Sequence, residues 1–437
     1  MKGQVYKGFS KLTEDQKRKL VSNLCDEPDA AELDMASFIV KDPSRRELFM
    51  DLSENTVSAY HLPYGIAPNV VVNGNVYHVP MVIEESSVVA AAASSARFWA
   101  DRGGFNVTQI STTKLGHVYF QWFGDADNLM AQWPELKKKL ISGTKVVTAS
   151  MVQRGGGITS LELSDETDTI DYLYRLVVEF DTVNSMGANF INTCLEELAQ
   201  ILDNGLNQGK SGEETDCRIV MSILSNFVDN CTVTVEVSCP IKNLLGITGG
   251  FSPQVFAEKM HLAYQIARNN IYRAVTHNKG IMNGVDSVLI ATGNDFRAAE
   301  AAAHAFAARD GSYRSLSDCK IENNNITIWL TIPMAVGTIG GITNLHPMAK
   351  KSLEILGHPS STELMGIIAS VGLASNFAAV QNLTTTGIQK GHMQLHLTNI
   401  FNALGATPKQ RQEANTYFQG KKVSFAAVKN FMDGKLS

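Results

Sequence analysis

The alternation of short β-like runs with longer helical patterns between Val107 and Phe227 constrains the fold of this chain more than any other feature. The segments "HVYFQWF" and "SLELSDET" are typical of strands, whereas "ADNLMAQWPELKKKLIS" is typical of a helix. The stretch "YLYRLVVEFDTVNSMGANFINTCLEELAQIL" predicts a strand that runs into a helix, and "CRIVMSILSNF" predicts one more strand. This alternation predicts a compact α+β insert of roughly 110 residues, which is a normal domain size.

The segments outside this insert predict further helices and a hairpin. "VVVNGNVYHVPMVI" predicts a β-hairpin with Asn73-Gly74 in the turn. "EESSVVAAAASSARFWADRGGF" predicts an Ala/Ser-rich helix that Ser86 or Ser87 caps and that stops at Gly103-Gly104. We expect short helices in the first fifty residues and an amphipathic helix in "SPQVFAEKMHLAYQIARNNIYRAV".

The composition excludes several classes of protein. With 437 residues, 44% hydrophobic and 19% charged, the chain is typical of a soluble protein of two or three domains. A net charge of −5 offers no general basic field for nucleic acid. The longest uncharged stretch, Ile326–Thr343, contains Pro333 and several glycines, which favour a buried strand and a turn over a membrane span. The six cysteines form no CxxC pair and the N-terminus resembles no signal peptide, so we expect a cytoplasmic protein.

The stretch "THNKGIMNGVDSVLIATGND" carries a lysine and an acid at its two ends. We interpret Val285–Ala291 as a strand between two turns, with Lys279 in one turn and Asp295 in the other. A solvated turn explains a lone lysine, and helix capping explains Asp295, which directly precedes a strong helical pattern. The alternative is that both belong to one site, where a partly desolvated lysine stabilises a developing oxyanion.

Two further groups could supply protons. Glu84 and Glu85 follow an apolar strand, so we expect one of them to point inward, where a buried carboxyl can serve as a general acid. The alternative for Glu85 is that it complements the dipole of the next helix. His392 and His396 have the i,i+4 spacing of a zinc helix, but the HExxH glutamate is missing, so no metal site is expected. His392 could instead protonate a leaving group.

No GxGxxG fingerprint follows a strand anywhere in the chain, so a standard Rossmann site for a dinucleotide is not expected. The glycines of 154–158 and 337–341 do not match its spacing. "SMGAN" (185–189) enters a helix with small residues, which lets a helix N-terminus approach a phosphate or an amide closely. Close packing of helices explains the same residues equally well.

Taken together, the motifs resemble those of the 3-hydroxy-3-methylglutaryl-coenzyme A reductase family, in its soluble bacterial class II form. The matching segments include "LPYGIAPN", "VPMVIEESSVVAAAASSA", "SMGANFINT", "ILSN", "YRAVTHNKGIMNG", "ATGND" and "GIQKGHMQLH". They occur in the family's order from about residue 50 to 400. The resemblance answers the question raised by Lys279 and Asp295, because in this family the two turns belong to one active site.

The resemblance implies a set of site residues. The catalytic set is Glu85, Lys279, Asp295 and His392, and the residues that hold the hydroxymethylglutaryl part are Ser87, Arg273 and Asn283. Residues that the resemblance places at the cofactor are Thr148, Asn184, Met186, Gly187, Ala188, Asn189 and Asn226.

The resemblance also implies a mixed α+β fold. A large dimerisation and coenzyme A-binding domain would comprise 1–110 and 221–380, and a small non-Rossmann domain at 111–220 would bind the nicotinamide cofactor. Residues 381–437 would form a mobile C-terminal flap. The active site would lie at the interface of a homodimer, so that a monomer would be inactive.

Two positions depart from the family pattern. The family usually has "DAMG" where this chain has "NSMG", so Asn184 replaces an acid near the nicotinamide. Alignment on the triple glycine places Thr148, with Lys145 nearby, where members that use NAD carry an aspartate for the ribose hydroxyls. The loss of an acid beside a cation favours the 2′-phosphate of NADPH over NADH.

The implied activity is reduction of hydroxymethylglutaryl-coenzyme A to mevalonate and coenzyme A with two NAD(P)H and no metal. One alternative is a coenzyme A-thioester hydrolase or acyltransferase, but none of the six cysteines lies in a motif that suits a nucleophile. Another alternative is a non-catalytic coenzyme A-binding homologue. Loss of a catalytic residue would favour it, whereas all four are present.

Overall fold

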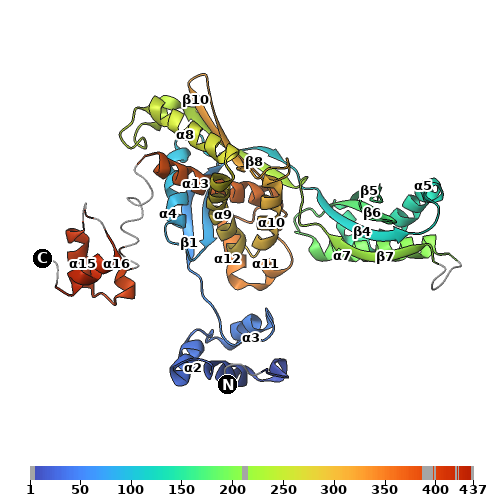
Figure 1. Ribbon diagram of the computed structural model, residues 1–437, viewed down its shortest axis with the longest axis horizontal. Coiled ribbons are helices and arrows are strands. Elements are labelled where there is room, and N and C mark those ends of the chain that lie inside the picture. The colour runs from blue at the N-terminus through green and yellow to red at the C-terminus, as the bar shows by residue number, and fades with distance from the viewer. Residues whose placement is uncertain are drawn as a thin grey trace. The chain divides into compact units, whose positions relative to one another are not determined.

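The structure is a computed structural model that describes residues 5–208, 215–385, 397, 400–418, 421 and 423–434 (Figure 1). By its contacts the chain divides into two units, Met1–Pro63 and Tyr64–Ser437. The first unit confirms the short helices predicted for the N-terminal segment. Its elements are η1 (Phe9–Lys11), α1 (Glu14–Ser22), α2 (Pro28–Ser37) and α3 (Pro43–Asp51).

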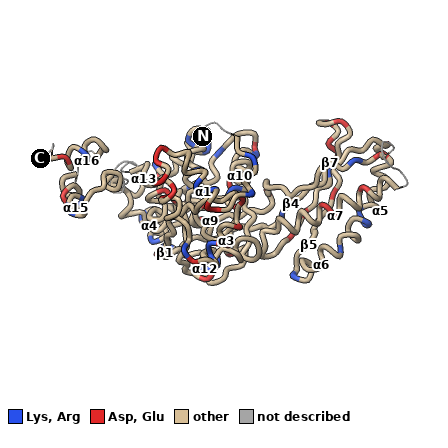
Figure 2. The backbone as a smooth tube through the Cα atoms, turned by 90° about the horizontal axis from the view of Figure 1, so that it is seen from below, with Lys and Arg blue, Asp and Glu red and all other residues tan. Residues whose placement is uncertain are grey.

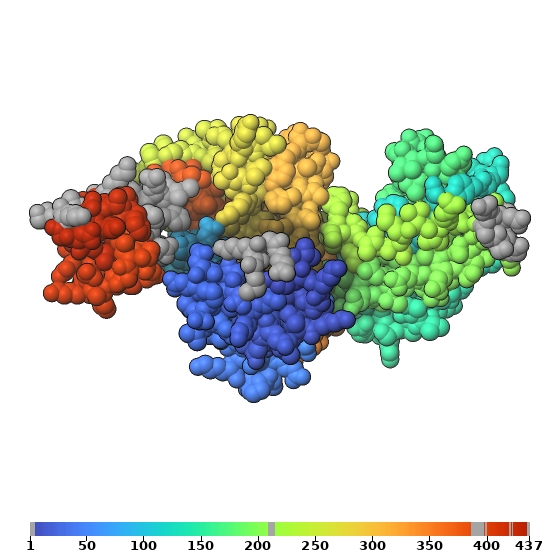
Figure 3. Space-filling view, turned by 60° about the horizontal axis from the view of Figure 1, so that its bottom comes forward, coloured from blue at the N-terminus to red at the C-terminus, as the bar shows by residue number. Residues whose placement is uncertain are grey.

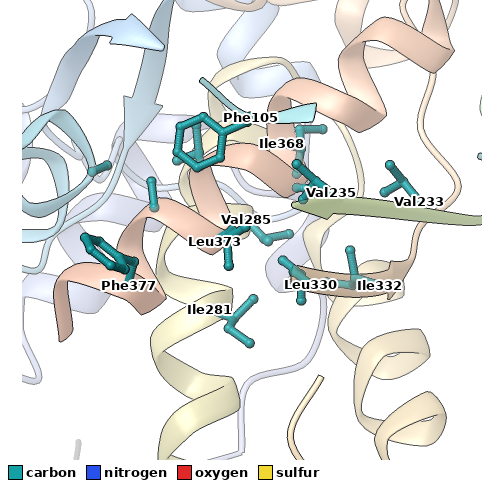
Figure 4. Packing of buried hydrophobic residues seen from close by; sticks show 14 of the residues in the cluster. Phe105, Val233, Val235, Ile281, Val285, Leu330, Ile332, Ile368, Leu373 and Phe377 are labelled. Atoms are coloured by element: carbon teal, nitrogen blue, oxygen red, sulfur yellow. The ribbon is translucent and has the colours of Figure 1, made fainter. Parts of the chain in front are cut away.

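The second unit contains an antiparallel sheet in the order β3-β8-β10-β9. Side chains in β8 and β10 alternate between buried and partly exposed, so one face of the sheet contributes to a large hydrophobic core. Figure 4 shows Val233 and Val235 of β8 close to Leu330 and Ile332 of β10, which are their register partners. The strands are β3 (Asn106–Ile110), β8 (Thr232–Pro240), β9 (Ser317–Glu322) and β10 (Asn325–Pro333). Because β10 lies within Ile326–Thr343, the buried strand predicted there is confirmed.

A long apolar helix, α13 (Ser361–Thr384), forms the centre of this core. Leu373 and Phe377 of α13 lie among the core side chains in Figure 4. Within the described residues, α13 is the one helix long and apolar enough to cross a membrane, yet 89% of its most apolar window is buried in the protein. Burial inside the fold therefore accounts for its composition.

Helix α9 (Ile271–Ala291) packs against α13 at unusually close range because both helices carry glycine at the contact. A Cβ atom on Gly284 would lie 2.6 Å from the Val371 carbonyl oxygen, and one on Gly372 would lie 2.8 Å from the Val285 side chain. The remaining helices of this region are α4 (Val88–Ala100), η3 (Ile241–Leu244), α8 (Pro253–Asn269), α10 (Phe296–Ala307), α11 (Ile342–Leu345) and α12 (Pro347–Ile355).

A buried polar network also holds α9 in place. The Nε2 atom of His277 lies 2.6 Å from the Ser317 hydroxyl, which donates to Oδ1 of Asn376 on α13 at 3.0 Å. His277 is 1% exposed, and burial together with the Arg273 charge lowers its pKa to about 3. The imidazole is therefore neutral in the folded protein.

The predicted hairpin is confirmed as β1 (Tyr64–Val72) and β2 (Asn75–Val82). Asn73 and Gly74 both have positive φ, as a two-residue hairpin turn requires. Helix α4 packs on β1, and Ser87 occupies its N-cap position with φ 80°. The Ser87 side chain makes no capping hydrogen bond there.

Within the α+β insert predicted between Val107 and Phe227, the residues from Lys114 onward form a second antiparallel sheet in the order β5-β6-β4-β7, with its own hydrophobic core. Its residues appear together, from cyan to yellow-green, in Figure 3. The strands are β4 (Lys114–Trp122), β5 (Gly157–Asp165), β6 (Leu173–Asp181) and β7 (Cys217–Leu224). The helices are α5 (Ala126–Gly143), α6 (Lys145–Gln153) and α7 (Ala188–Leu206).

The interpretation of Val285–Ala291 as a strand is wrong, because these residues form the last two turns of α9. Lys279 therefore lies inside a helix and not in a turn. The run of Val, Leu and Ile was too short to distinguish a buried strand from a buried helix. Burial of Ile281, Val285 and Val288 on one face reveals the helical period.

The C-terminal segment contains α15 (Pro408–Tyr417) and α16 (Phe425–Met432), which share a small hydrophobic cluster. His392 and His396 lie outside the described residues. Along the whole described chain, basic and acidic residues are interspersed, as Figure 2 shows. No single element concentrates positive charge in that view.

The close approach of α9 and α13 predicts opposite effects for two alanine substitutions. Gly284→Ala should lower the free energy of unfolding by about 1–3 kcal/mol, because the added methyl meets the α13 backbone. The matched control is Gly280→Ala in the same helix, where nothing lies within 4 Å. That variant should gain about 0.5–1 kcal/mol from helix propensity. Urea unfolding of both variants measures this, and equal effects would contradict the packing argument.

The neutral state of His277 predicts a loss of stability in acid. An unfolded histidine takes up a proton near pH 6.5, whereas folded His277 resists protonation down to about pH 3. Between these values the unfolded state binds more protons, so acidification lowers the free energy of unfolding by up to about 1.4 kcal/mol per pH unit from this residue. Urea unfolding from pH 7 to 4 should show the slope, and His277→Gln should flatten it. Substitution of the exposed His78 by Gln should leave this slope as it is. An unchanged slope in His277→Gln would refute the assignment of the pH dependence to His277.

Candidate active site

Three of the predicted site residues meet at the surface of α9. The ammonium of Lys279 donates to Oε2 of Glu85 at 2.5 Å, and the amide of Asn283 lies 3.4 Å from the same oxygen. Lys279 and Asn283 are four residues apart in α9 and therefore share one face of the helix. Glu85 reaches them from the segment between β2 and α4.

Both ends of this ion pair are accessible to solvent. The side chain of Lys279 is 60% exposed and that of Glu85 is 42% exposed. Glu84 is exposed as well, so the expectation that one of the two glutamates is buried is wrong. The apolar strand β2 ends at Val82, before the two glutamates, so neither follows its inward alternation. An accessible lysine–carboxylate pair leaves both groups within reach of a substrate.

The two other residues predicted to hold the substrate lie near this cluster along the chain. Ser87 is two residues from Glu85, at the start of α4, and is partly buried. Arg273 begins α9 and is half-buried, and burial lowers the pKa of its guanidinium. Six residues separate it from Lys279, which places the two about 120° apart around the helix. Arg273 therefore lies on a different face of α9 from the Lys279–Asn283 pair.

Asp295 caps the next helix, α10, as the capping interpretation predicted. Its carboxylate accepts from the Ala298 N–H at 3.1 Å and lies 3.7 Å from Nε of Arg297. Within the described chain no hydrogen bond joins Asp295 to Lys279. The turn before Asp295 nevertheless has a second role, because Oδ1 of Asn294 accepts from the Gly337 N–H at 2.8 Å.

Gly337 connects the turn before Asp295 with residues 184–187, the predicted cofactor loop. A Cβ atom on Gly337 would lie 2.3 Å from the Met186 nitrogen, so only glycine allows this approach. Ser185 pairs with Ile339 as an isolated β-bridge. Three segments that are far apart in sequence, 184–187, 293–295 and 337–339, therefore meet in space.

The predicted cofactor loop enters α7 through a glycine that cannot be replaced without strain. Gly187 has φ 89°, and a Cβ atom there would lie 2.4 Å from Thr182. Met186, Ala188 and Asn226 line one narrow cavity, together with residues of β4 and α10. Asn189 is exposed at the start of α7. Small residues thus leave the N-terminus of α7 open to a ligand.

Asn184 has a structural explanation that the sequence did not supply. Its Oδ1 accepts from the Ser361 N–H at 2.9 Å, and its backbone carbonyl accepts from the Thr338 N–H at 2.8 Å. Ser361 begins α13, so Asn184 connects the second sheet to the central helix. An aspartate could accept the same hydrogen bond, so the amide keeps the contact without the charge.

The side chain of Thr148 is buried. It is 7% exposed on α6, and its hydroxyl donates to the Thr144 carbonyl at 3.0 Å. Lys145, by contrast, is exposed in the first turn of α6. Lys145 is therefore the one basic side chain of α6 that could bind a phosphate.

Two features of the site were missed by the sequence interpretation. Lys114, at the start of β4, is 4% exposed and lines the same cavity as Met186. Asp286 lies on the Lys279–Asn283 face of α9, and burial with the nearby Glu300 carboxyl raises its pKa to about 8. Neither residue occurs in a motif, and only tertiary burial distinguishes them from ordinary surface charges.

The described residues hold no cluster of three or more His, Cys, Asp or Glu that could bind a metal ion. The buried cysteines are also poor nucleophiles. Burial raises the pKa of Cys231 to about 11 and that of Cys319 to about 12. The geometry therefore favours chemistry at the Lys279–Glu85 pair over attack by one of these thiols.

Comparison with known proteins identifies the family to which this chain is similar. The model of the family "Hydroxymethylglutaryl-coenzyme A reductase" matches residues 14–397. The 3-hydroxy-3-methylglutaryl-coenzyme A reductase of Archaeoglobus fulgidus is 35% identical over 407 residues, 92% of this chain and 87% of that protein. A probable reductase of Borreliella burgdorferi is 32% identical over 85% of this chain and 82% of its own length.

A solved structure extends the comparison to the fold. The class II enzyme of Streptococcus pneumoniae, bound to NADPH in open conformations, matches with a TM-score of 0.70 and 36% identity. The match covers 87% of this chain and 100% of the other. The chain belongs to the hydroxymethylglutaryl-coenzyme A reductase family and is of the class II, bacterial type.

Proposed function

We propose that the chain reduces hydroxymethylglutaryl-coenzyme A to mevalonate and coenzyme A, using two molecules of NADPH. The observation that carries this proposal is the contact of Lys279 with Glu85, beside Asn283. An ammonium and a carboxyl group that share a hydrogen bond can hold a thioester oxygen and supply a proton to it. The bound nicotinamide supplies the hydride in each of two steps.

Lys279 would stabilise the negative charge that develops on the thioester oxygen in the first step. Its ammonium is accessible and already oriented by Glu85, so little reorganisation is required. Asn283 adds a second N–H donor on the same face of α9. Glu85 would then deliver the proton when the aldehyde is reduced.

Four further residues complete the proposed machinery. Asp295 would influence the proton network from the N-terminus of α10, and Arg273 and Ser87 would hold the substrate's carboxylate and hydroxyl. His392 would protonate the departing thiolate as the C-terminal segment closes. Its role comes from the family resemblance, since it lies outside the described residues.

NADPH is favoured over NADH on two grounds. The similar enzyme of Streptococcus pneumoniae binds NADPH. In this chain the exposed Lys145 is available for a 2′-phosphate, whereas the Thr148 hydroxyl is bonded within its own helix.

The residues 111–220 would bind the cofactor, and 1–110 with 221–380 would bind coenzyme A. Such an enzyme would act in the cytoplasm.

The proposal is tested by following cofactor oxidation and free thiol in one reaction. Hydroxymethylglutaryl-coenzyme A should consume two NADPH per thiol released, and NADPH should react faster than NADH. Lys279→Met should lower kcat by about 100- to 1000-fold, the range for loss of one oxyanion donor.

The chain offers a matched control for Lys279. Lys351 forms an ion pair with Glu354 of the same length, 2.5 Å, and similar exposure, but on α12. Lys351→Met should therefore leave kcat unchanged. Thiol release without NADPH oxidation would identify a hydrolase, and binding without either product would identify a non-catalytic homologue.

We further propose a homodimer with the active site at the subunit interface. Helix α8 and the start of α9 expose a row of apolar side chains, which a single chain leaves in contact with water. These residues are Val255, Leu262, Ile266, Ile271, Tyr272 and Val275. This row ends in α9, the helix that carries Lys279 and Arg273. A second chain that paired through the row would therefore lie close to the site.

Leu262→Glu should dissociate this dimer, because it places a charge among the exposed apolar residues of α8. Sedimentation velocity should give the mass of two chains for the unaltered protein and of one chain for the variant, with loss of activity. Val146→Glu, at a valine of α6 that is more exposed than Leu262, is the control and should remain dimeric. A fully active monomer would refute the interface.

A further inference from the structure

The strand β4 begins with a lysine that is almost completely removed from water. Lys114 is 4% exposed, and its ammonium donates to the Thr182 hydroxyl at 2.5 Å and to the Ser185 carbonyl at 3.3 Å. The Thr182 hydroxyl in turn donates to the same carbonyl at 2.6 Å. Lys114 is therefore bonded to both ends of the turn that leads to Met186 and Gly187.

This buried cation has no carboxylate in direct contact among the described residues. Asp181 is close enough to favour the charged form, but its carboxylate accepts the Val183 N–H. The neighbouring thiol, Cys231, is neutral because burial raises its pKa to about 11. An ammonium has three N–H donors, and two oxygens of the described chain accept from this one.

A buried charge without a carboxylate in direct contact is costly, so its position calls for a functional explanation. Burial lowers the pKa of Lys114, while the two oxygen acceptors favour the protonated form. Lys114 also lines the narrow cavity that contains Met186, Ala188 and Asn226. Most of the other residues around this cavity are apolar, including Ala298 and Ala302 of α10, so the field of the ammonium is weakly screened there.

We propose that Lys114 determines which oxidation state of the nicotinamide the enzyme binds more tightly. The oxidised ring carries a positive charge and the reduced ring is neutral, so a fixed cation beside the cavity repels the oxidised form alone. Lys114 therefore favours NADPH over NADP⁺ and promotes release of the oxidised cofactor between the two hydride steps. This inference rests on the proposed function, because it requires the nicotinamide to bind beside Met186 and Ala188.

Binding of the two cofactor forms to the full-length protein tests the inference without turnover. Dissociation constants for NADPH and NADP⁺ are measured by titration calorimetry in the absence of substrate. Lys114→Met removes the charge with little change of volume, and it should lower the ratio of the NADP⁺ constant to the NADPH constant by about tenfold. Lys114→Gln, which keeps a polar donor without the charge, should do the same. Lys114→Arg, which keeps the charge, should restore the original ratio.

A merely structural role of Lys114 predicts a different result. Thr182→Val removes one of the two oxygen acceptors and retains the cation. If the charge acts on the cofactor, this variant weakens both forms equally and leaves the ratio unchanged. If Thr182→Val shifts the ratio as far as Lys114→Met, the lysine acts only by holding the turn, and the inference is overturned.

The outcomes also separate this inference from the proposed function. An unaltered protein that binds neither form of the cofactor would refute the function itself. An unaltered protein that binds NADPH and completes the reaction, with the same ratio in Lys114→Met and Lys114→Gln, would refute only the role of Lys114.

Discussion

The close packing of α9 against α13 is the contact on which the rest of the site depends. Gly284 and Gly372 let the two backbones approach until a single methyl group would collide with the opposite helix. The network of His277, Ser317 and Asn376 then fixes the rotation of α9, because a buried polar group must keep its partners. With one face held in the core, the opposite face presents Lys279 and its neighbours to solvent.

The second sheet is joined to this core through a small number of backbone contacts. Asn184 bonds to the start of α13 and to the loop after β10, and Gly337 bonds to the turn that contains Asn294. The proposed cofactor loop and the N-terminus of α10 therefore share a partner. A shift of the second sheet would reach Asp295 through this loop, which would connect the proposed cofactor site with the proposed acid–base groups.

Two residues, Asn184 and Lys114, influence the charge around the proposed nicotinamide site. Asn184 is neutral where the family usually has an acid. Lys114 adds a buried cation, whose ammonium donates to the carbonyl of the next residue, Ser185. Both features make this region more positive. A more positive environment disfavours a cationic ring, so the two residues together are consistent with an enzyme that consumes reduced cofactor.

The sequence by itself determined the hairpin at Asn73-Gly74, the α+β insert and the glycine entry to α7, since turn chemistry and periodicity are local properties. The family resemblance placed Glu85 and Lys279 in one catalytic set, and the structure shows the two in contact. Only the tertiary structure decided that Val285–Ala291 is helical, because a short buried apolar run has the same composition in either form. Only tertiary burial could distinguish Lys114 from a surface lysine, because desolvation depends on segments that are distant in sequence.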